Sequence, residues 1–420
     1  MVCRVPTRET EAIRDEYRSR LQQRRAELGR LQQRDRLVAN LRLAAALAIL
    51  VLAWLAFGQR MFSPAWLAVA AVGFAALVHL HHRVVNRRIA LERAARFYES
   101  GLARLEDRWA GSGTRGGRFR DEAHPYSEDL DLFGEGSLFE LLCRARTPTG
   151  EERLASWLLE PAEVGELGAR QEAVRELEPM LDLREELAVL AEEVRGETEP
   201  DALRAWGHEP PPAPRPATRI GAVLLATTTV VTLVLATMGE IPPIVPIAVL
   251  VAQWGFARIH RDRVREVLEA AQRPCHDLEL LAAMLERISS GEFRSARLRE
   301  LHTALETEGL APHARLRRLR LLIDSLDARL NPFFAPIGAL MLWTTQFSFA
   351  LAAWRSRHGP AMIRWLDVVG EFEALASLAC HCHENPEDAF PEFDAGPARF
   401  VAGGLGHPLL ARAQCCLLYT

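Results

Sequence analysis

Lysine is absent from this sequence of 420 residues, so arginine supplies every fixed side-chain cation. A phosphate-binding loop of the GxxxxGK[ST] type needs a lysine that reaches the β- and γ-phosphates, so these residues contain no such loop. Residues 1–40 are polar and rich in arginine, which argues against a cleavable signal peptide. The net charge of −4 gives no general attraction to nucleic acid or to an anionic membrane.

Sustained alternation of apolar and polar residues, the pattern of a half-buried strand, is also missing. Apolar residues recur instead at helical spacing, as in Leu278, Leu281, Leu285 and Ile288. The sequence therefore predicts an all-α fold. The seven cysteines are odd in number and scattered, which favours reduced thiols in a cytoplasmic setting over a disulfide framework.

Four of the apolar runs form two pairs. The first pair covers 43–57 and 61–80, and only "GQR" separates its two runs. The second pair covers 220–238 and 241–257, with Glu240 as the only charge near its turn. A bilayer core requires about 20 apolar residues per helix, so each pair predicts a helical hairpin that crosses the membrane twice.

The arginines orient both hairpins. They flank the polar ends of each pair, whereas the first turn carries only Arg60 and the second turn carries none. The flanking residues are Arg34, Arg36, Arg42, Arg83, Arg87 and Arg88 for the first pair, and Arg215, Arg219, Arg258, Arg261, Arg263 and Arg265 for the second. By the positive-inside rule, the turns face out and the large polar segments are cytoplasmic, as in a multi-pass protein of the cell membrane.

A further apolar run, 333–354, is long enough to span a membrane. It also contains residues that are polar or restrict the backbone, namely Pro336, Thr344, Thr345, Gln346 and Ser348. A fifth span would place 355–420 outside the cell. We favour a buried helix of a soluble domain, because length alone does not identify a span.

The polar parts of the chain carry helix-capping signals. Ser137 to Glu140 fits a capping box, and Thr149 to Glu152 fits a second one. Residues 8–40 predict a charged amphipathic helix, read either as a solvated helix that leads to the membrane or as a coiled-coil partner site.

Three motifs each allow a functional and a structural interpretation. Gly111 to Gly116 match GxGxxG, but the motif follows a polar helix, which indicates a flexible linker rather than a dinucleotide site. The segment "CHCHE" at 380–384 offers metal ligands, yet neighbours on a helix point about 100° apart, which favours helix-end packing. His79, His81 and His82 indicate neutral imidazoles at the membrane interface, because the spans hold no acidic partner for a proton or metal pathway.

A basic region in the middle of the chain predicts either contacts with DNA phosphates or a solvated helix face. Its arginines are Arg294, Arg297, Arg299, Arg315, Arg317, Arg318 and Arg320. Nearby glutamates offset their charge, which favours the solvated face. No catalytic constellation stands out, so we assign no catalytic, cofactor-binding, metal-binding or nucleic-acid-binding residue.

Short pieces of 127–177 together form a recognisable pattern. They are Leu130 to Phe133, Ser137-Leu138-Phe139, Leu141-Leu142, Thr147-Pro148-Thr149-Gly150, Trp157-Leu158-Leu159-Glu160-Pro161 and Arg170-Gln171-Glu172-Ala173-Val174. The segment resembles the start of the core region of the MutS family of DNA mismatch-repair ATPases. Residues 370–393 resemble the helix that closes that core, and "GLGHPLL" at 404–410 resembles the segment that leads into the family's ATPase domain.

The resemblance covers about 127–208 and 260–410 and implies a helical core with lever helices. It also implies binding of mismatched DNA, with ATP and Mg²⁺ as cofactors of the full-length family only. After Leu410 the sequence "ARAQCCLLYT" departs from the family pattern, and the first hairpin replaces the mismatch-reading domain. We therefore expect a truncated or frame-shifted, non-catalytic chain that does not hydrolyse ATP by itself.

The expected partners are the lipid bilayer, duplex DNA, and either a second copy in a homodimer or another protein. An alternative function is a non-enzymatic membrane scaffold that binds a protein partner through its helical core. A small transporter is disfavoured, because the predicted spans lack polar residues that would form a conduit.

These observations predict eight segments. They are a charged N-terminal helix (1–40), transmembrane hairpin 1 (41–82), a helix with a Gly-rich linker (83–135), the first MutS-core-like helices (136–208), a Pro-rich linker (209–219), transmembrane hairpin 2 (220–257), lever helices (258–384) and a tail that begins a missing ATPase domain (385–420).

Overall fold

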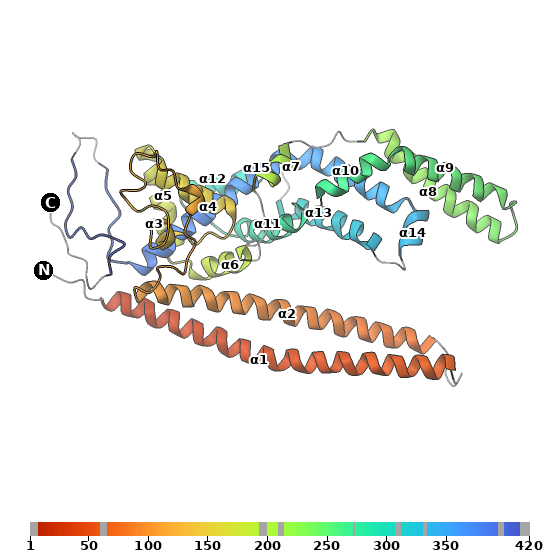
Figure 1. Cartoon of the computed structure of the whole chain (residues 1–420), viewed down its shortest axis with the longest axis horizontal. Helices are drawn as coiled ribbons and strands as arrows, with labels where there is room; N and C mark the ends of the chain where they lie inside the picture. Colours follow the sequence, from red (N-terminus) through yellow and green to blue (C-terminus); the bar gives the residue numbers. More distant parts are fainter. Residues whose placement is uncertain are drawn as a thin grey trace. The chain divides into compact units, whose positions relative to one another are not determined.

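The structure is a computed structural model, described here for residues 7–58, 65–192, 200–208, 214–271, 274–306, 312–330, 334–393 and 399–411. Within these ranges it consists of helices, turns and loops without a β-strand, which confirms the predicted all-α fold (Figure 1). The chain divides into two compact units. Unit 1 takes its residues from Met1–Cys143, Glu178–Glu192 and Leu378–Thr420, and unit 2 from Arg144–Leu177 and Glu193–Ser377.

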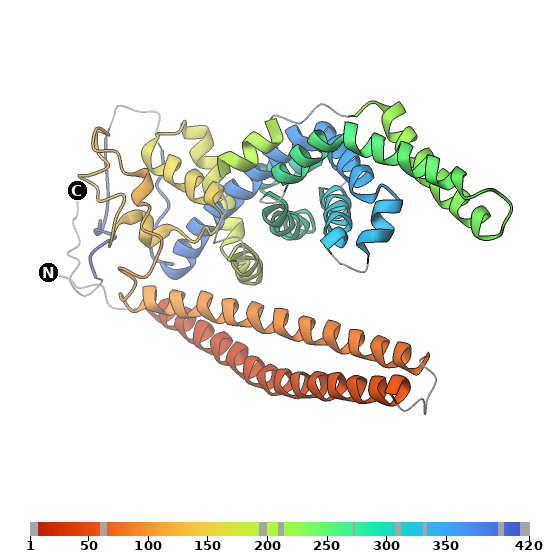
Figure 2. The same ribbon diagram turned by 45° about the vertical axis from the view of Figure 1, so that its right-hand side comes forward.

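Unit 1 contains an antiparallel pair of long helices, α1 (Arg8–Ala53) and α2 (Ala65–Leu105), as Figures 1 and 2 show. The Thr7 side chain caps α1 by accepting from the Thr10 N–H at 3.4 Å. The sequence predicted a boundary near residue 40, but α1 passes through it without a break, because α1 contains no proline. A short π-helical segment, η1 (Trp54–Gly58), follows α1, and the rest of the predicted turn lies outside the described residues.

The α1/α2 pair has an apolar part and a polar part. In the apolar part, Leu43, Leu50 and Val72 are 63%, 66% and 71% exposed. In the polar part, Asp35 of α1 accepts a hydrogen bond from Arg88 Nη1 of α2 at 3.1 Å. The two helices therefore pack through charged residues on one side of residue 40 and present bare apolar side chains on the other.

The Gly-rich segment that was predicted to be a flexible linker is a packed loop of unit 1. Gly116, with φ of +64°, caps the short 3-10 helix η2 (Gly117–Phe119), and this positive φ suits glycine. The rings of Phe119, Phe133 and Phe139 lie with centroids 5.5 to 5.9 Å apart. These aromatic contacts order the loop that precedes α3 (Leu138–Leu142). The glycine content of the segment did not indicate them.

Both predicted helix starts exist, one of them two residues earlier than predicted. Ser137 caps α3 and accepts from the Glu140 N–H at 3.2 Å, which confirms the first capping signal. In unit 2, Thr147 rather than Thr149 caps α4 (Pro148–Leu159), accepting from the Gly150 N–H at 3.1 Å. The shift follows from Pro148, whose fixed φ suits the first position of a helix.

The core of unit 2 forms where several helices meet α15 (Trp343–Glu384), whose residues up to Ser377 belong to this unit. The other helices outside the second hairpin are α5 (Val164–Leu177), α7 (Pro200–His208), α10 (Arg261–Ala271), α11 (Pro274–Ser289), α12 (Ala296–Leu305) and α13 (Pro312–Asp327). Buried side chains from four of these elements, including Leu177, Met284, Leu298 and Phe372, supply the core.

Unit 2 also contains a second antiparallel pair, α8 (Pro216–Thr237) and α9 (Ile244–Ile259), visible in Figures 1 and 2. Its outer side chains are apolar and bare, as in Leu224, Val251 and Trp254, which are 60%, 63% and 68% exposed. Two helices in the described residues are long and apolar enough to cross a membrane, Arg8–Ala56 and Pro216–Thr237. The apolar helix α9 is shorter, at 16 residues.

The run 333–354 is neither a span nor a single buried helix. Its described residues form the short helix α14 (Ala335–Leu340) and the start of α15, and Leu342 between them has a φ of +48°. A positive φ is costly for a leucine, and it separates the two helices at this point. Only the second part matches the buried helix that we predicted, with Phe349, Leu351 and Ala352 each 1% exposed.

Candidate functional site

In unit 1, the C-terminal end of α15 meets α1 and α2 through a buried ion pair. Arg104 of α2 and Glu384 of α15 are 8% and 3% exposed. Arg104 Nε donates to Glu384 Oε2 at 2.5 Å, and Arg104 Nη2 donates to Oε1. The buried Tyr17 of α1 donates its hydroxyl to the same Oε1 at 3.4 Å. One carboxylate therefore joins three helices, and we call this group the Glu384 junction.

The helix α6 (Leu181–Ala191) joins the same junction through Arg184. Arg184 is 2% exposed and donates from Nη1 to Cys380 Sγ at 3.2 Å and from Nη2 to the Glu178 carbonyl at 2.6 Å. Buried guanidinium groups are costly unless they are paired, so two arginines here require the charge of Glu384 and these acceptors.

Burial sets the protonation of the junction's other groups. His383 stacks on Tyr17 with centroids 5.8 Å apart, and desolvation, followed by the charge of Arg184, lowers the pKa of His383 to about 4. Desolvation also raises the pKa of Cys382 to about 11 and the pKa of Tyr17 well above its usual value. His383 is therefore neutral at pH 7 and Cys382 is a thiol, so neither of these two groups is charged at that pH.

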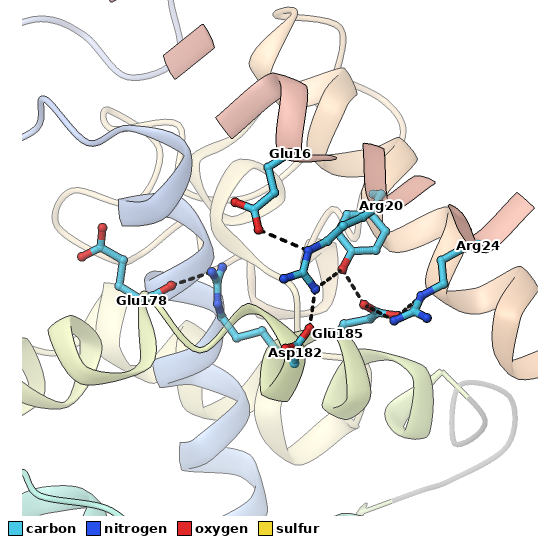
Figure 3. A network of polar contacts seen from close by, with 8 residues as sticks. Glu16, Arg20, Arg24, Glu178, Asp182 and Glu185 are labelled. Carbon is cyan, nitrogen blue, oxygen red and sulfur yellow. Dashed lines mark hydrogen bonds and ion pairs between the residues drawn. The ribbon is translucent and has the colours of Figure 1, made fainter. Parts of the chain in front are cut away.

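A second polar network ties α1 and α2 to α6, as Figure 3 shows. Arg24 Nε and Nη2 donate to the two oxygens of Glu185 at 2.8 and 3.1 Å. Arg20 donates to Glu16 at 3.2 Å and to Asp182. The buried Tyr98 of α2 donates its hydroxyl to Glu185, so this carboxylate links three helices in the same way as Glu384.

A cavity of about 1210 Å³ lies beside the Glu384 junction, within unit 1. Arg104, His381 and Glu384 line its polar part, and the tail residues 385–393 and 399–410 supply much of the remaining wall. The wall includes "GLGHPLL", the sequence that resembles the approach to an ATPase domain. The cavity therefore marks where this tail meets the helix end, and two of its charged lining residues, Arg104 and Glu384, are paired with each other.

In unit 2, a different carboxylate holds the beginning of α4 against α15. Glu373 Oε1 accepts from the N–H groups of Arg146 and Thr147 at 2.9 and 3.3 Å, and Oε2 accepts from the Thr147 hydroxyl. Desolvation raises the pKa of Glu373 to about 7, although these hydrogen bonds favour the charged form. The helix α4 thus begins on a carboxyl group that changes its charge near neutral pH.

Two glycines allow this close crossing of α4 and α15. A Cβ on Gly370 would lie 2.8 Å from the Thr149 carbonyl oxygen, and a Cβ on Gly150 would lie 2.5 Å from Glu373 Oε2. Next to the crossing, Ser377 accepts from the Arg144 N–H at 3.0 Å, and Arg297 of α12 forms two hydrogen bonds with Glu371 at 2.5 and 2.8 Å. The crossing is therefore closely packed and rich in side-chain-to-backbone hydrogen bonds.

The "CHCHE" segment provides packing contacts rather than convergent ligands. Cys380 faces Arg184, Glu384 faces Arg104, and His381 Nδ1 lies 3.3 Å from Asn385 Nδ2. Across the described residues, no group of three or more His, Cys, Asp or Glu side chains is placed to hold a metal ion. Cys3, Cys415 and Cys416 lie outside these residues, as does the side chain of Cys275.

The other motifs occupy ordinary structural positions. In the GxGxxG segment, the Gly113 N–H donates to Glu140 Oε1 at 2.7 Å, and a loop rather than a long helix follows. His81 Nδ1 lies 3.3 Å from Asp35 Oδ1, an acidic partner just outside the apolar run, while His79 and His82 are exposed. None of these groups faces a common site.

The basic region is partly used in internal contacts. Arg297 pairs with Glu371 and Glu300, and Arg315 is 6% exposed. Arg317, Arg318 and Arg320 are exposed on α13, and Arg320 lies 4.0 Å from Asp324. Arg294 and Arg299 are exposed as well, but the three arginines of α13 form the denser cluster of exposed charge for phosphate contacts.

Sequence reasoning missed the residues of the Glu384 junction. Tyr17, Arg104 and Arg184 lie in separate charged helices, and no local pattern links them to Glu384, which is 367 residues from Tyr17. One usable signal existed for α15. Glu371, Glu373 and Glu384 lie among the mostly apolar residues of the C-terminal part of α15, and buried carboxylates of this kind require partners.

Comparisons of the chain with protein-family models, with curated proteins and with solved structures give no match.

Proposed function

We propose that this chain is a multi-pass membrane protein. In this proposal the apolar parts of α1/α2 and the whole of α8/α9 form two hairpins in the bilayer, and the other helices form a cytoplasmic body. Two helices of sufficient length and hydropathy support it, together with the bare apolar side chains of both pairs. Apolar patches of this extent are rare on soluble monomers, and the arginines that flank each pair obey the positive-inside rule.

We further propose that the cytoplasmic body is of the MutS-core type. The observation that carries this proposal is the crossing of α4 and α15 in unit 2. α4 belongs to segment 127–177 and much of the end of α15 to segment 370–393, and each segment resembles the same family core. About 200 residues of chain separate the two segments. Their contact at Gly370, Thr147 and Glu373 is what a shared core requires, so it supports the resemblance.

In this role the chain is a membrane-tethered lever protein without catalytic activity of its own. The helix α15 serves as the lever, because its residues belong to both units and buried carboxylates hold it in each. We propose duplex DNA as the ligand of the body, contacted by Arg317, Arg318 and Arg320. With no lysine for a phosphate loop, these residues do not hydrolyse ATP by themselves.

The experiment is a titration of the intact chain, held in lipid nanodiscs, with matched and mismatched duplex DNA at several salt concentrations. We expect salt-dependent binding. Replacing Arg317, Arg318 and Arg320 by alanine should lower the slope of log affinity against log salt by about 3. A control variant with Arg30, Arg115 and Arg120 replaced has the same net charge and should keep the slope. Failure to bind DNA at low salt would remove the DNA role.

A membrane scaffold that binds a protein partner, or a second copy, through the helical body is the second candidate. The use of Arg297 and Arg315 in internal contacts favours it, because these two arginines are then not available to phosphates. In the same nanodiscs, a homodimer detected by mass measurement together with no DNA binding would support the scaffold.

A further inference from the structure

One side chain inside the second hairpin holds the short helix α14. Gln253 of α9 is 4% exposed, and its Nε2 donates to the carbonyl oxygens of Ala339 and Leu340, both at 2.9 Å. Its Oε1 accepts from the hydroxyl of Thr229 on α8. The amide thus donates two hydrogen bonds and accepts one. The two donated bonds satisfy the last carbonyl groups of α14, which have no partner within the helix.

Gln253 lies well inside the apolar length of the hairpin. Arg258, the first cation after α9's apolar run, is five residues further along, so Gln253 is about 7.5 Å inside that boundary at 1.5 Å per residue. Amphipathic helices that lie in the plane of a bilayer are buried by about 5–10 Å. The end of α14 therefore has the depth of an in-plane helix if α8/α9 is embedded.

A second observation places the start of α15 at the same depth in the bilayer as the end of α14. A cavity of about 180 Å³ is lined by Arg219 and Val223 of α8 and by Phe347 and Phe349 of α15. Arg219 is the last cation before α8's apolar run, so the first turns of α15 lie at the edge of that run. Since only Met341 and Leu342 separate α14 from α15, both estimates of the depth of α14 agree.

The outer face of α14 consists of apolar groups. Its exposed side chains, together with that of the adjoining Met341, are Ala335, Pro336, Ile337, Ala339 and Met341. No charged residue occurs between Phe334 and Trp354. The helix has six residues, about 9 Å in length, so it is far too short to cross a bilayer.

An aromatic group fixes the other side of α14. Phe334 packs against Trp343 with centroids 5.0 Å apart, and Trp343 Nε1 donates to the Ser325 carbonyl of α13 at 2.5 Å. Tryptophan with one hydrogen-bonded end is typical of the membrane interface. The positive φ of Leu342 then turns the chain from α14 into α15.

We infer that α14 lies in the plane of the bilayer at its cytoplasmic boundary. It would be the third lipid-contacting element after the two hairpins, and Gln253 holds it to the α8/α9 hairpin by hydrogen bonds. The occupant of its apolar face is the acyl region of the lipid, because this face continues the bare apolar surface of α8/α9 at the same depth. The inference rests on the proposed membrane insertion of that hairpin.

The test is photo-crosslinking to lipid with the full chain in phosphatidylcholine vesicles that contain an alkyne-tagged phosphatidylcholine. Three single variants carry p-benzoylphenylalanine in place of Val251, Ile337 or Leu321. Val251 reports the hairpin, Ile337 reports α14, and Leu321 of α13 is the matched control, since it is 60% exposed against 52% for Ile337. We expect lipid adducts at 251 and 337 and at least about tenfold less at 321.

A second variant tests the role of the amide. Gln253→Leu removes the bonds to α14 and should lower the adduct at 337 about tenfold while the adduct at 251 persists, because the released carbonyls seek water. Thr227→Val is the control, since the Thr227 hydroxyl bonds only to its own helix at Val223 and Leu224 and its loss should change neither adduct.

The outcomes separate the inference from the proposed function. An adduct at 251 with none at 337, or a protein-to-protein dimer formed from 337, overturns the inference and leaves the membrane hairpin intact. Absence of lipid adducts at 251 overturns the membrane hairpin itself and the inference with it. Lipid adducts at 251 and 337 that Gln253→Leu does not change would show that α14 contacts lipid without its bond to the hairpin, against the inference as stated.

Discussion

The two units hold one helix, α15, by different chemistry. In unit 1, Glu384 is paired with the guanidinium of Arg104, and both groups are buried. In unit 2, Glu373 is also buried, but it accepts hydrogen bonds from two backbone N–H groups and the Thr147 hydroxyl. An opposite charge keeps a buried carboxylate ionised, whereas neutral donors offset desolvation only in part. α15 therefore carries a buried carboxylate paired with a cation in unit 1 and a buried carboxyl group with a raised pKa in unit 2.

The largest expected effect comes from breaking the ion pair of unit 1. Arg104→Ala leaves Glu384 buried without its cation, which should lower the free energy of unfolding by about 3–5 kcal/mol. Thermal unfolding of the full chain in nanodiscs, followed by tryptophan fluorescence, measures the loss. Arg25→Ala, which breaks the exposed pair with Glu99, should cost at most about 1 kcal/mol.

The double variant Arg104→Met/Glu384→Leu sharpens this test. It removes both charges of the pair and fills the space with apolar groups, so it should be more stable than Arg104→Ala, although the buried Arg184 loses the nearby charge of Glu384. A double variant as unstable as the single one would contradict the account, because the loss would then come from packing and not from an unpaired charge.

The next effect is a pH dependence in unit 2. The pKa of Glu373 is raised to about 7 in the folded protein from 4.5, so the native state binds more protons between these values. The stability from this group is therefore complete below pH 4.5 and is lost as the pH rises to 7, by about 3 kcal/mol in total. Glu373→Gln keeps the acceptor for both N–H groups and should remove this part of the slope of unfolding free energy against pH. An unchanged slope in the variant would mean that Glu373 is ionised throughout.

A smaller effect is expected from the glycine at the helix crossing. In Gly370→Ala the new Cβ meets the Thr149 carbonyl, and the forced shift should cost about 1–3 kcal/mol. Gly168→Ala in α5 is the matched control, because nothing lies within 4 Å of its Cβ, and it should stabilise the protein by up to about 1 kcal/mol. Equal effects of the two variants would show that α4 and α15 do not approach as closely as described.

The smallest expected effect has the opposite sign to that of Glu373, and solvent weakens it because His383 is only half-buried. The pKa of His383 is lowered to about 4 from 6.5, so the unfolded state binds more protons between these values. The stability from His383 is complete above pH 6.5 and is lost as the pH falls toward 4. His383→Phe keeps the stacking on Tyr17 and should weaken the acid dependence of unit 1 unfolding. Identical acid curves for the variant and the parent chain would rule out this contribution.

Helical periodicity predicted the all-α fold, and the capping signal at Ser137 was confirmed. The sequence did not predict the break at Leu342, because nothing in a leucine residue signals a positive φ. The packed loop around Gly116 was also missed, since the aromatic contacts that order it come from Phe133 and Phe139, outside the glycine motif. Such features depend on tertiary contacts, which local patterns do not contain.

The candidate sites were less predictable than the fold. Tyr17 and Glu384 meet across 367 residues, and only the burial of both helices makes their contact necessary. The sequence did not predict the site in unit 2 either, because it indicated a helix start at Thr149, whereas the true cap, Thr147, is the partner of Glu373. A shift of two residues in one cap therefore concealed the site in unit 2.

The membrane hairpin is the central claim, and the absence of lysine allows a direct test. A single introduced lysine would be the only side-chain amine, and peptide mass spectrometry separates it from the N-terminal amine. Glu240→Lys in the turn after α8 and Arg258→Lys at the end of α9 are both at exposed positions. In intact cells, a membrane-impermeant amine reagent should label residue 240, and it should label residue 258 only after permeabilisation. Equal labelling, or equal protection, of the two positions in intact cells would contradict the account.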